Sequence, residues 1–122
     1  MVLLAPVDVI LSNEDTVQPD LVFVSNARKD RVAAEGIRGG PDLCVEVLSS
    51  HSREMDRRTK RKLYARHEVL EYWIVDPEPR TIELYRLAEN VESPLRTFKL
   101  METLASPLFS GLSLALEEVF AE

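Results

Sequence analysis

The sequence predicts an α/β fold in which helices pack on a mixed β-sheet, and three stretches carry that prediction. Residues 43–48 are almost continuously apolar, which is typical of a strand covered on both faces. A charged helix is expected from Ser52, a favourable N-cap, to about Arg66. Residues 72–75 and 81–87 are apolar runs joined by a turn rich in proline and acid, as in a β-hairpin. Strands before and after a single helix favour a mixed sheet.

The other expected elements are shorter. They are strands at residues 2–11, 20–24 and 96–101, a short helix within 28–35, and a terminal helix near 116–120. Pro107 and Gly111 indicate a loop before that last helix. The 122 residues are enough for one core, so we expect a single domain over 1–122. No apolar run approaches the ~20 residues that span a bilayer, so no membrane partner is expected.

Charge is distributed unevenly along the chain. The net charge of -6 argues against a protein that coats nucleic acid through bulk electrostatics. Residues 53–66, however, hold seven basic and two acidic side chains, which concentrates positive charge in the expected helix. The lone cysteine, Cys44, cannot form an internal disulfide, which fits a reducing cytoplasm, and it is expected to be a small buried side chain.

Glu46 lies in the middle of the apolar strand. Alternation places it on one face with Asp42, Cys44 and Leu48. A carboxylate in such surroundings needs a metal, a cation or a hydrogen-bond donor, because unpaired burial costs several kcal/mol. The alternative is a strand end where Glu46 reaches solvent. Asp42 lies ~13 Å back along the strand and is expected to cap its entrance instead.

The expected helix directs one lysine toward the sheet. At ~100° per residue, Met55, Leu63 and Tyr64 define the inward side, with Asp56 about 20° and Lys60 about 60° from Leu63. An exposed Asp56–Lys60 pair is the simpler interpretation, and a lysine beside the strand carboxylate is the sharper one. Three arginines are expected on the outer surface, as a solvated face or a contact for phosphates: Arg57, Arg58 and Arg61.

Asp20 supplies a second strand carboxylate, since it follows Pro19 at the start of an apolar run. Two carboxylates on neighbouring strands would form a hard oxygen site suited to Mg²⁺ or Mn²⁺. A nearby lysine could then orient the attacking water or offset phosphate charge. Spacing alone does not show that Asp20 and Glu46 meet.

A set of short motifs resembles one known family. The motifs are Pro19-Asp20, the strand Val45 to Ser49, a helix with Asp56, Lys60 and Tyr64, and the strand Glu71-Tyr72-Trp73 followed by Val75-Asp76-Pro77. Together they are similar to the Uma-type family of restriction endonucleases, within the PD-(D/E)XK nuclease superfamily. The resemblance covers nearly the whole chain and implies a restriction-endonuclease-like mixed β-sheet flanked by helices.

The resemblance also implies a site. Asp20 and Glu46 would bind Mg²⁺ or Mn²⁺, and Lys60 would complete the catalytic set, replacing a lysine that the superfamily usually carries at the position of Leu48. Tyr64 and Asp56 would support Lys60, with Tyr64 as a possible phosphate contact. The helix arginines would contact the DNA backbone. The expected activity is cleavage of DNA phosphodiester bonds by a homodimer, because cutting both strands needs two sites.

Departures from the family pattern leave alternatives open. Family members usually carry more chain at the N-terminus, so we expect a short member, and Ser50 and Glu68 replace the usual proline and glycine. A non-catalytic remnant that binds DNA or a protein, or an oligomerising module with a structural Glu46–Lys60 ion pair, would fit the same residues. Ser49 to Ser52 with His51 are interpreted as a turn and a helix cap, not a nucleophile and base. Tyr72 and Trp73 are expected in the core.

Overall fold

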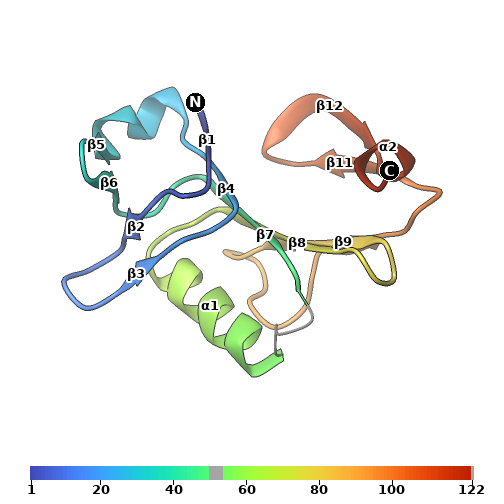
Figure 1. Ribbon diagram of the computed structural model, residues 1–122, viewed down its shortest axis with the longest axis horizontal. Coiled ribbons are helices and arrows are strands. Elements are labelled where there is room, and N and C mark those ends of the chain that lie inside the picture. Colours follow the sequence, from blue (N-terminus) through green and yellow to red (C-terminus); the bar gives the residue numbers. More distant parts are fainter. Residues whose placement is uncertain (50–53, 122) are drawn as a thin grey trace.

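The computed structural model describes residues 1–49 and 54–121 (Figure 1). Its centre is a six-stranded mixed sheet in the order β1-β4-β7-β8-β9-β10. These strands are β1 (Val2–Leu4), β4 (Leu21–Phe23), β7 (Leu43–Val47), β8 (Glu71–Asp76), β9 (Thr81–Arg86) and β10 (Arg96–Phe98). The neighbours β7 and β8 are parallel, with helix α1 (Glu54–Arg66) in the connection between them, and the other neighbouring pairs are antiparallel. The predicted mixed α/β sheet is confirmed.

A smaller sheet forms beside the N-terminal end. It has the order β3-β2-β6-β5, with β2 (Val9–Ile10), β3 (Thr16–Val17), β5 (Val32–Ala33) and β6 (Gly36–Arg38). The single strand expected over residues 2–11 is therefore wrong: it divides between two sheets, because Pro6 has no amide hydrogen with which to continue a ladder. The helix expected within 28–35 is instead a 3₁₀ helix, η1 (Asn26–Arg31), followed by β5.

Two apolar clusters cover the faces of the large sheet. Strand alternation sends Cys44 and Leu48 toward α1, and Leu43 and Val45 toward the opposite face. That opposite face is covered by a C-terminal hairpin, β11 (Thr103–Ser106) and β12 (Phe109–Ala115), with helix α2 (Leu116–Val119). Figure 1 shows α1 and this hairpin on opposite sides of the sheet. The loop expected around Pro107 is thus a tight turn between strands.

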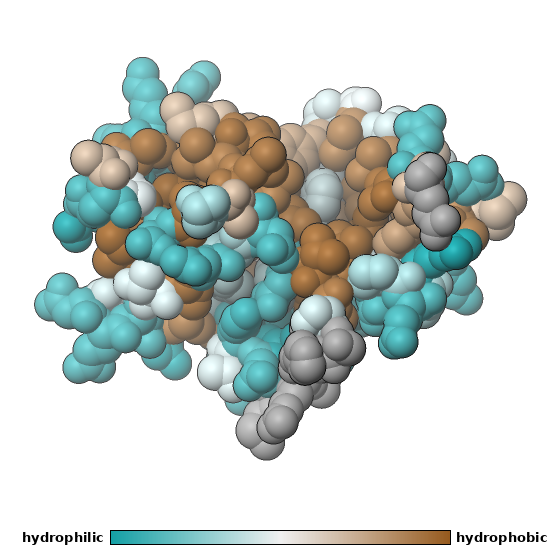
Figure 2. Space-filling view, in the orientation of Figure 1, coloured by the Kyte–Doolittle hydropathy of each residue, from teal (hydrophilic) through white to brown (hydrophobic). Residues whose placement is uncertain are grey.

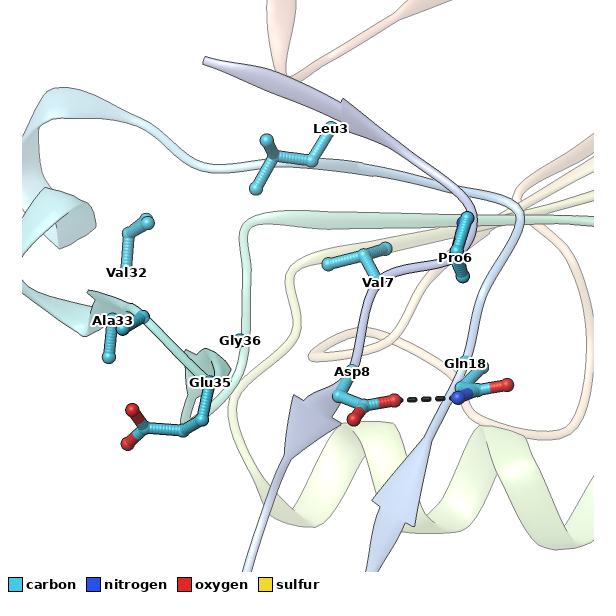
Figure 3. Close-up of a pocket in the computed structure, with 10 residues that line it drawn as sticks. Leu3, Pro6, Val7, Asp8, Gln18, Val32, Ala33, Glu35 and Gly36 are labelled. Atoms are coloured by element: carbon cyan, nitrogen blue, oxygen red, sulfur yellow. Dashed lines mark hydrogen bonds between the residues drawn. The ribbon is translucent and has the colours of Figure 1, made fainter.

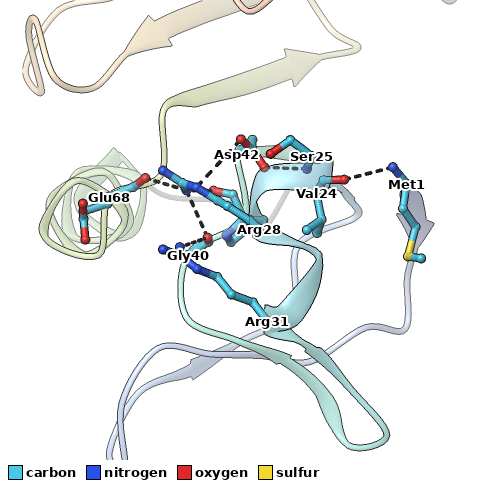
Figure 4. Close-up of polar contacts among 9 residues, drawn as sticks. Met1, Val24, Ser25, Arg28, Arg31, Gly40, Asp42 and Glu68 are labelled. Carbon is cyan, nitrogen blue, oxygen red and sulfur yellow. Dashed lines mark hydrogen bonds and ion pairs between the residues drawn. The ribbon is translucent and has the colours of Figure 1, made fainter.

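Arginines of η1 fix the entrance of β7 (Figure 4). Arg28 Nη1 donates to three backbone oxygens, those of Gly40, Pro41 and Glu68, and Arg31 Nη1 donates to the first of them at 2.6 Å. Asp42 is buried, accepts the Ser25 amide at 2.7 Å and lies 3.8 Å from Arg28 Nε. The role expected for Asp42 at the strand entrance is confirmed.

The surface carries exposed apolar residues at the N-terminal edge of the sheet. Met1, Val2 and Leu4 are each more than half exposed. Figure 2 shows apolar side chains gathered over the N-terminal part of the molecule and again over the C-terminal hairpin. Within the described residues, no helix has the length and apolar character needed to cross a lipid bilayer.

Candidate active site

Glu46 lies near the C-terminal end of β7, on the face that α1 covers. Its side chain is 16% exposed, and its two oxygens have different partners. Lys60 Nζ donates to Oε1 at 2.8 Å, and the Tyr72 hydroxyl donates to Oε2. The carboxylate expected to need a partner therefore has two, and one of them is a cation.

Lys60 reaches Glu46 from α1, as the helical wheel predicted. Its side chain is 37% exposed, so the ammonium group bridges the half-buried carboxylate and solvent. Asp56 is exposed, and among the described residues it forms no ion pair with Lys60. The simpler interpretation of an Asp56–Lys60 pair is wrong in this structure, and the supporting role expected of Asp56 stays a prediction.

Asp20 lies beside Glu46 at the edge shared by β4 and β7. Leu21 pairs with Val45 at this end of the ladder, and Asp20 directly precedes Leu21, opposite Glu46 in the antiparallel register. Its amide donates to the Val45 carbonyl at 3.0 Å, and its Oδ2 accepts the Val47 amide at 2.7 Å. Among the described residues, Oδ1 accepts no hydrogen bond, and the residue is exposed. Asp20 thus presents one carboxylate oxygen to solvent next to the Glu46–Lys60 pair.

Three buried side chains next to this site are neutral. Burial raises the pKa of Cys44, of Tyr64 and of Tyr72, and the negative charge of Glu46 raises all three further. The charge of Asp20 also raises the pKa of Tyr64, so both carboxylates act on the same phenol. The two phenols stay protonated at neutral pH, and Tyr72 therefore acts as a donor. Cys44 is buried, as expected.

Tyr64 lies on the inward side of α1, as the helical wheel predicted, and belongs to the core cluster. It is 1% exposed, its hydroxyl lies beside the Cys44 thiol, and its ring packs 5.0 Å from that of Tyr72. A side chain enclosed in this way cannot contact phosphate. The prediction of such a contact is wrong, because the inward face of α1 includes Tyr64 as a core residue.

The helical wheel placed Arg61 on the outer surface, but the structure buries it. It is 3% exposed, donates from Nε to the Val91 carbonyl at 3.0 Å, and lies with its guanidinium 4.9 Å from the centre of the Tyr85 ring. A long side chain can bury its stem while its head finds a carbonyl and an aromatic face. Arg61 is therefore a packing residue, not a DNA contact.

The other two arginines keep more solvent access. Arg58 is exposed and pairs with Glu92, with Nε 3.2 Å from Oε2. Arg57 is half-buried. Their contact with a nucleic-acid backbone stays a prediction. Ser52 as a helix cap, His51, and the inward side chain of Met55 fall outside the described residues or side chains.

The donor set fits a hydrated hard cation better than an enclosed one. Among the described residues, no three His, Cys, Asp or Glu side chains form a group that could hold a metal. Two adjacent carboxylates are present, and Mg²⁺ typically binds through one or two carboxylates while keeping several waters. The oxygens of Asp20 and Glu46 therefore suit a divalent ion that remains open to solvent.

Tyr72 is the site residue that the sequence did not reveal. The parallel register pairs Cys44 with Tyr72, so Tyr72 is a diagonal neighbour of Glu46 on the same face. The sequence contains both strands, but Tyr72 can be assigned to the site only when β7 and β8 are known to pair in parallel and in this register. An aromatic residue in an apolar strand otherwise indicates only core.

One hollow of the described structure is lined by none of the site residues Asp20, Glu46 and Lys60. A cavity of about 400 Å³ lies at the small sheet, lined in part by Leu3, Asp8, Gln18 and Glu35 (Figure 3). Asp8 accepts a hydrogen bond from Gln18 at 2.6 Å, and no basic side chain lines the cavity. A smaller hollow of about 200 Å³ lies between Leu48 at the end of β7 and the turn after β8. Among the described residues, neither hollow is lined by Glu46 or Lys60, and Asp20 is exposed at the strand edge.

Comparisons with known proteins relate this chain and its fold to proteins described as putative nucleases. Residues 1–117 match the model of the Uma2 family, described as "Putative restriction endonuclease", and the chain belongs to that family. The fold is also that of a solved putative nuclease of the DUF820 group from Anabaena variabilis, with a TM-score of 0.77 and 20% identity over 98% of this chain and 67% of that one. No curated protein matches.

Proposed function

We propose that this protein is a metal-dependent endonuclease that hydrolyses DNA phosphodiester bonds. The observation that carries the proposal is the ammonium group of Lys60 on Glu46, directly beside the solvent-facing carboxylate of Asp20. Membership of a restriction endonuclease family supports nucleic acid as the substrate. The exposed position of the site suits a polymer, which could not enter a closed pocket.

In this proposal Asp20 and Glu46 hold Mg²⁺ or Mn²⁺, the ion class that restriction-endonuclease-like proteins generally use. A bound divalent ion lowers the pKa of water and polarises a phosphoryl oxygen. The Val47 amide fixes one Asp20 oxygen and leaves the other free to bind. Lys60, which is partly exposed, orients the attacking water or offsets the charge of the phosphate.

The surroundings of the site supply the remaining parts of the proposal. Arg57 and Arg58, on the same helix as Lys60, contact the DNA backbone without reading sequence. The described residues carry one such site, and simultaneous cleavage of both strands needs two, so we expect a homodimer. The free thiol of Cys44 suits a reducing compartment, and we place the protein in the cytoplasm.

A supercoiled plasmid incubated with rising Mg²⁺ or Mn²⁺ tests the proposal. The variants Asp20→Asn, Glu46→Gln and Lys60→Met should each lower the nicking rate by about 10² or more, since each removes a charge from the reacting centre. Lys62→Met is the matched control, because Lys62 is exposed on the same helix and should leave the rate unchanged.

The outcomes separate the rival interpretations. The absence of both metal binding and cleavage in the parent protein would overturn the proposal and favour a non-catalytic remnant of the fold. Loss of stability without any metal-dependent activity in Glu46→Gln and Lys60→Met would point to a structural ion pair. Metal-dependent nicking that survives Glu46→Gln would place the active centre elsewhere.

A further inference from the structure

Tyr72 contacts the oxygen of Glu46 that Lys60 does not use. Its hydroxyl donates to Oε2, while the Lys60 ammonium lies 2.8 Å from Oε1. The two partners come from different elements, β8 and α1. The carboxylate is therefore held from both ends, and its two oxygens are not equivalent.

The surroundings of Tyr72 make it a rigid donor. The residue is 0% exposed, and its ring packs against those of Tyr64 and Tyr85, with centroids 5.0 and 6.3 Å away. A packed ring of this kind cannot swing away when a ligand arrives. Oε2 thus stays bound to protein.

We propose that Tyr72 is a positioning residue that makes Glu46 a one-oxygen ligand and thereby favours Mg²⁺ over Ca²⁺. The inference rests on the proposed function, because it assumes that Glu46 binds a divalent ion. Mg²⁺ requires near-octahedral geometry and is satisfied by single carboxylate oxygens together with water. Ca²⁺ takes more ligands and often binds both oxygens of one carboxylate. A carboxylate that keeps one oxygen bound to the Tyr72 hydroxyl therefore suits Mg²⁺ and disfavours Ca²⁺.

The hydroxyl of Tyr72 can be removed without removing the ring. Tyr72→Phe keeps the packing against the neighbouring tyrosines and frees Oε2 to join a ligand shell. Partners that orient a metal ligand typically change metal affinity by about 10- to 100-fold. We therefore expect the ratio of the Ca²⁺ to the Mg²⁺ dissociation constant to fall by about tenfold in Tyr72→Phe.

Tyr64→Phe is the matched control. It also removes one buried hydroxyl from the same cluster, but among the described residues the donors to the Glu46 carboxylate are Lys60 and Tyr72, not Tyr64. A general loosening of the core would weaken both ions alike and would appear in both variants. Only a role in positioning the carboxylate changes the ratio between the ions, and only in Tyr72→Phe.

Isothermal titration of Mg²⁺ and of Ca²⁺ into the three full-length proteins, without DNA, measures this ratio. A fall in Tyr72→Phe with no change in Tyr64→Phe supports the inference. An unchanged ratio in Tyr72→Phe, with Mg²⁺ still bound by the parent protein, overturns it and leaves the proposed function standing. A parent protein that binds neither ion overturns both.

Discussion

Two glutamates on neighbouring parallel strands have opposite surroundings. Glu71 begins β8 on the face covered by the C-terminal hairpin and is 1% exposed. Its carboxylate accepts hydrogen bonds from Ser106 Oγ at 2.6 Å, Trp73 Nε1 at 2.9 Å and the Leu108 amide at 3.0 Å. Glu46, on the α1 face of β7, is bound by a phenol and an ammonium group at a partly open strand end.

The difference shows that burial of a carboxylate does not by itself indicate a reactive site. Glu71 has three fixed neutral donors, two of them in the hairpin, so it joins the hairpin to the sheet and has no accessible oxygen for a ligand. Glu46 has a partly exposed cation, Lys60, as a partner and an exposed carboxylate, Asp20, next to it. What distinguishes the two glutamates is the charge and the solvent exposure of their partners.

The largest predicted effect is on the hairpin side. Glu71→Ala leaves two buried donors, Ser106 Oγ and Trp73 Nε1, without their acceptor, and the Leu108 amide keeps only its bond to Ser106 Oγ. It should lower the free energy of unfolding by about 3–5 kcal/mol. Glu46→Gln, at a partly exposed position, should cost less than about 1.5 kcal/mol. Urea unfolding followed by circular dichroism compares the two variants. Equal losses would contradict the division into a structural and a functional glutamate.

A smaller effect on the free energy of unfolding is expected at alkaline pH, from buried groups on the α1 side of the sheet. Folding keeps protons on Cys44, Tyr64 and Tyr72 that the unfolded chain loses above its ordinary pKa values, 9.0 for cysteine and 10.0 for tyrosine. The folded state binds more protons there, so stability is complete below about pH 9 and falls as the pH rises, by about 1.4 kcal/mol per pH unit for each group.

Urea unfolding at a series of pH values measures that slope. In Cys44→Ala, the decrease in the free energy of unfolding that begins near the ordinary cysteine pKa should be absent. In Tyr64→Phe, the decrease that begins near the ordinary tyrosine pKa should be smaller by the contribution of one tyrosine. A free energy of unfolding that stays constant or rises through this range would show that these groups are not buried as neutral species.

The smallest predicted effects distinguish two arginines of α1. Arg61→Ala should cost about 1–2 kcal/mol, because the Val91 carbonyl and the Tyr85 ring lose their partner. Arg58→Ala removes only an exposed pair with Glu92 and should change stability by less than about 0.5 kcal/mol. If Arg58 contacts phosphate, Arg58→Ala should also weaken DNA binding. The slope of the logarithm of the binding constant against the logarithm of the salt concentration should then fall in magnitude by about one. Fluorescence anisotropy with labelled duplex DNA at several salt concentrations tests this, and an unchanged slope would remove Arg58 from the interface.

Local pattern was enough to predict several elements and one contact. The strand at β7, the helix ending at Arg66 and the hairpin of β8 and β9 follow from apolar runs and turn residues within short windows. Lys60 was assigned to the sheet side of α1 because helical periodicity fixes which side chains share a face. Those features depend on neighbours a few residues away.

The tertiary structure decided what depends on distant partners. It divided residues 2–11 between two sheets, formed the hairpin of β11 and β12, and buried Arg61 against a carbonyl 30 residues along the chain. It also brought Tyr72 to Glu46, 26 residues away, through the parallel register of β7 and β8. The sequence by itself thus determined which residues carry charge on which local face. Only long-range strand pairing decided which of those charges meet, because periodicity carries no information about register.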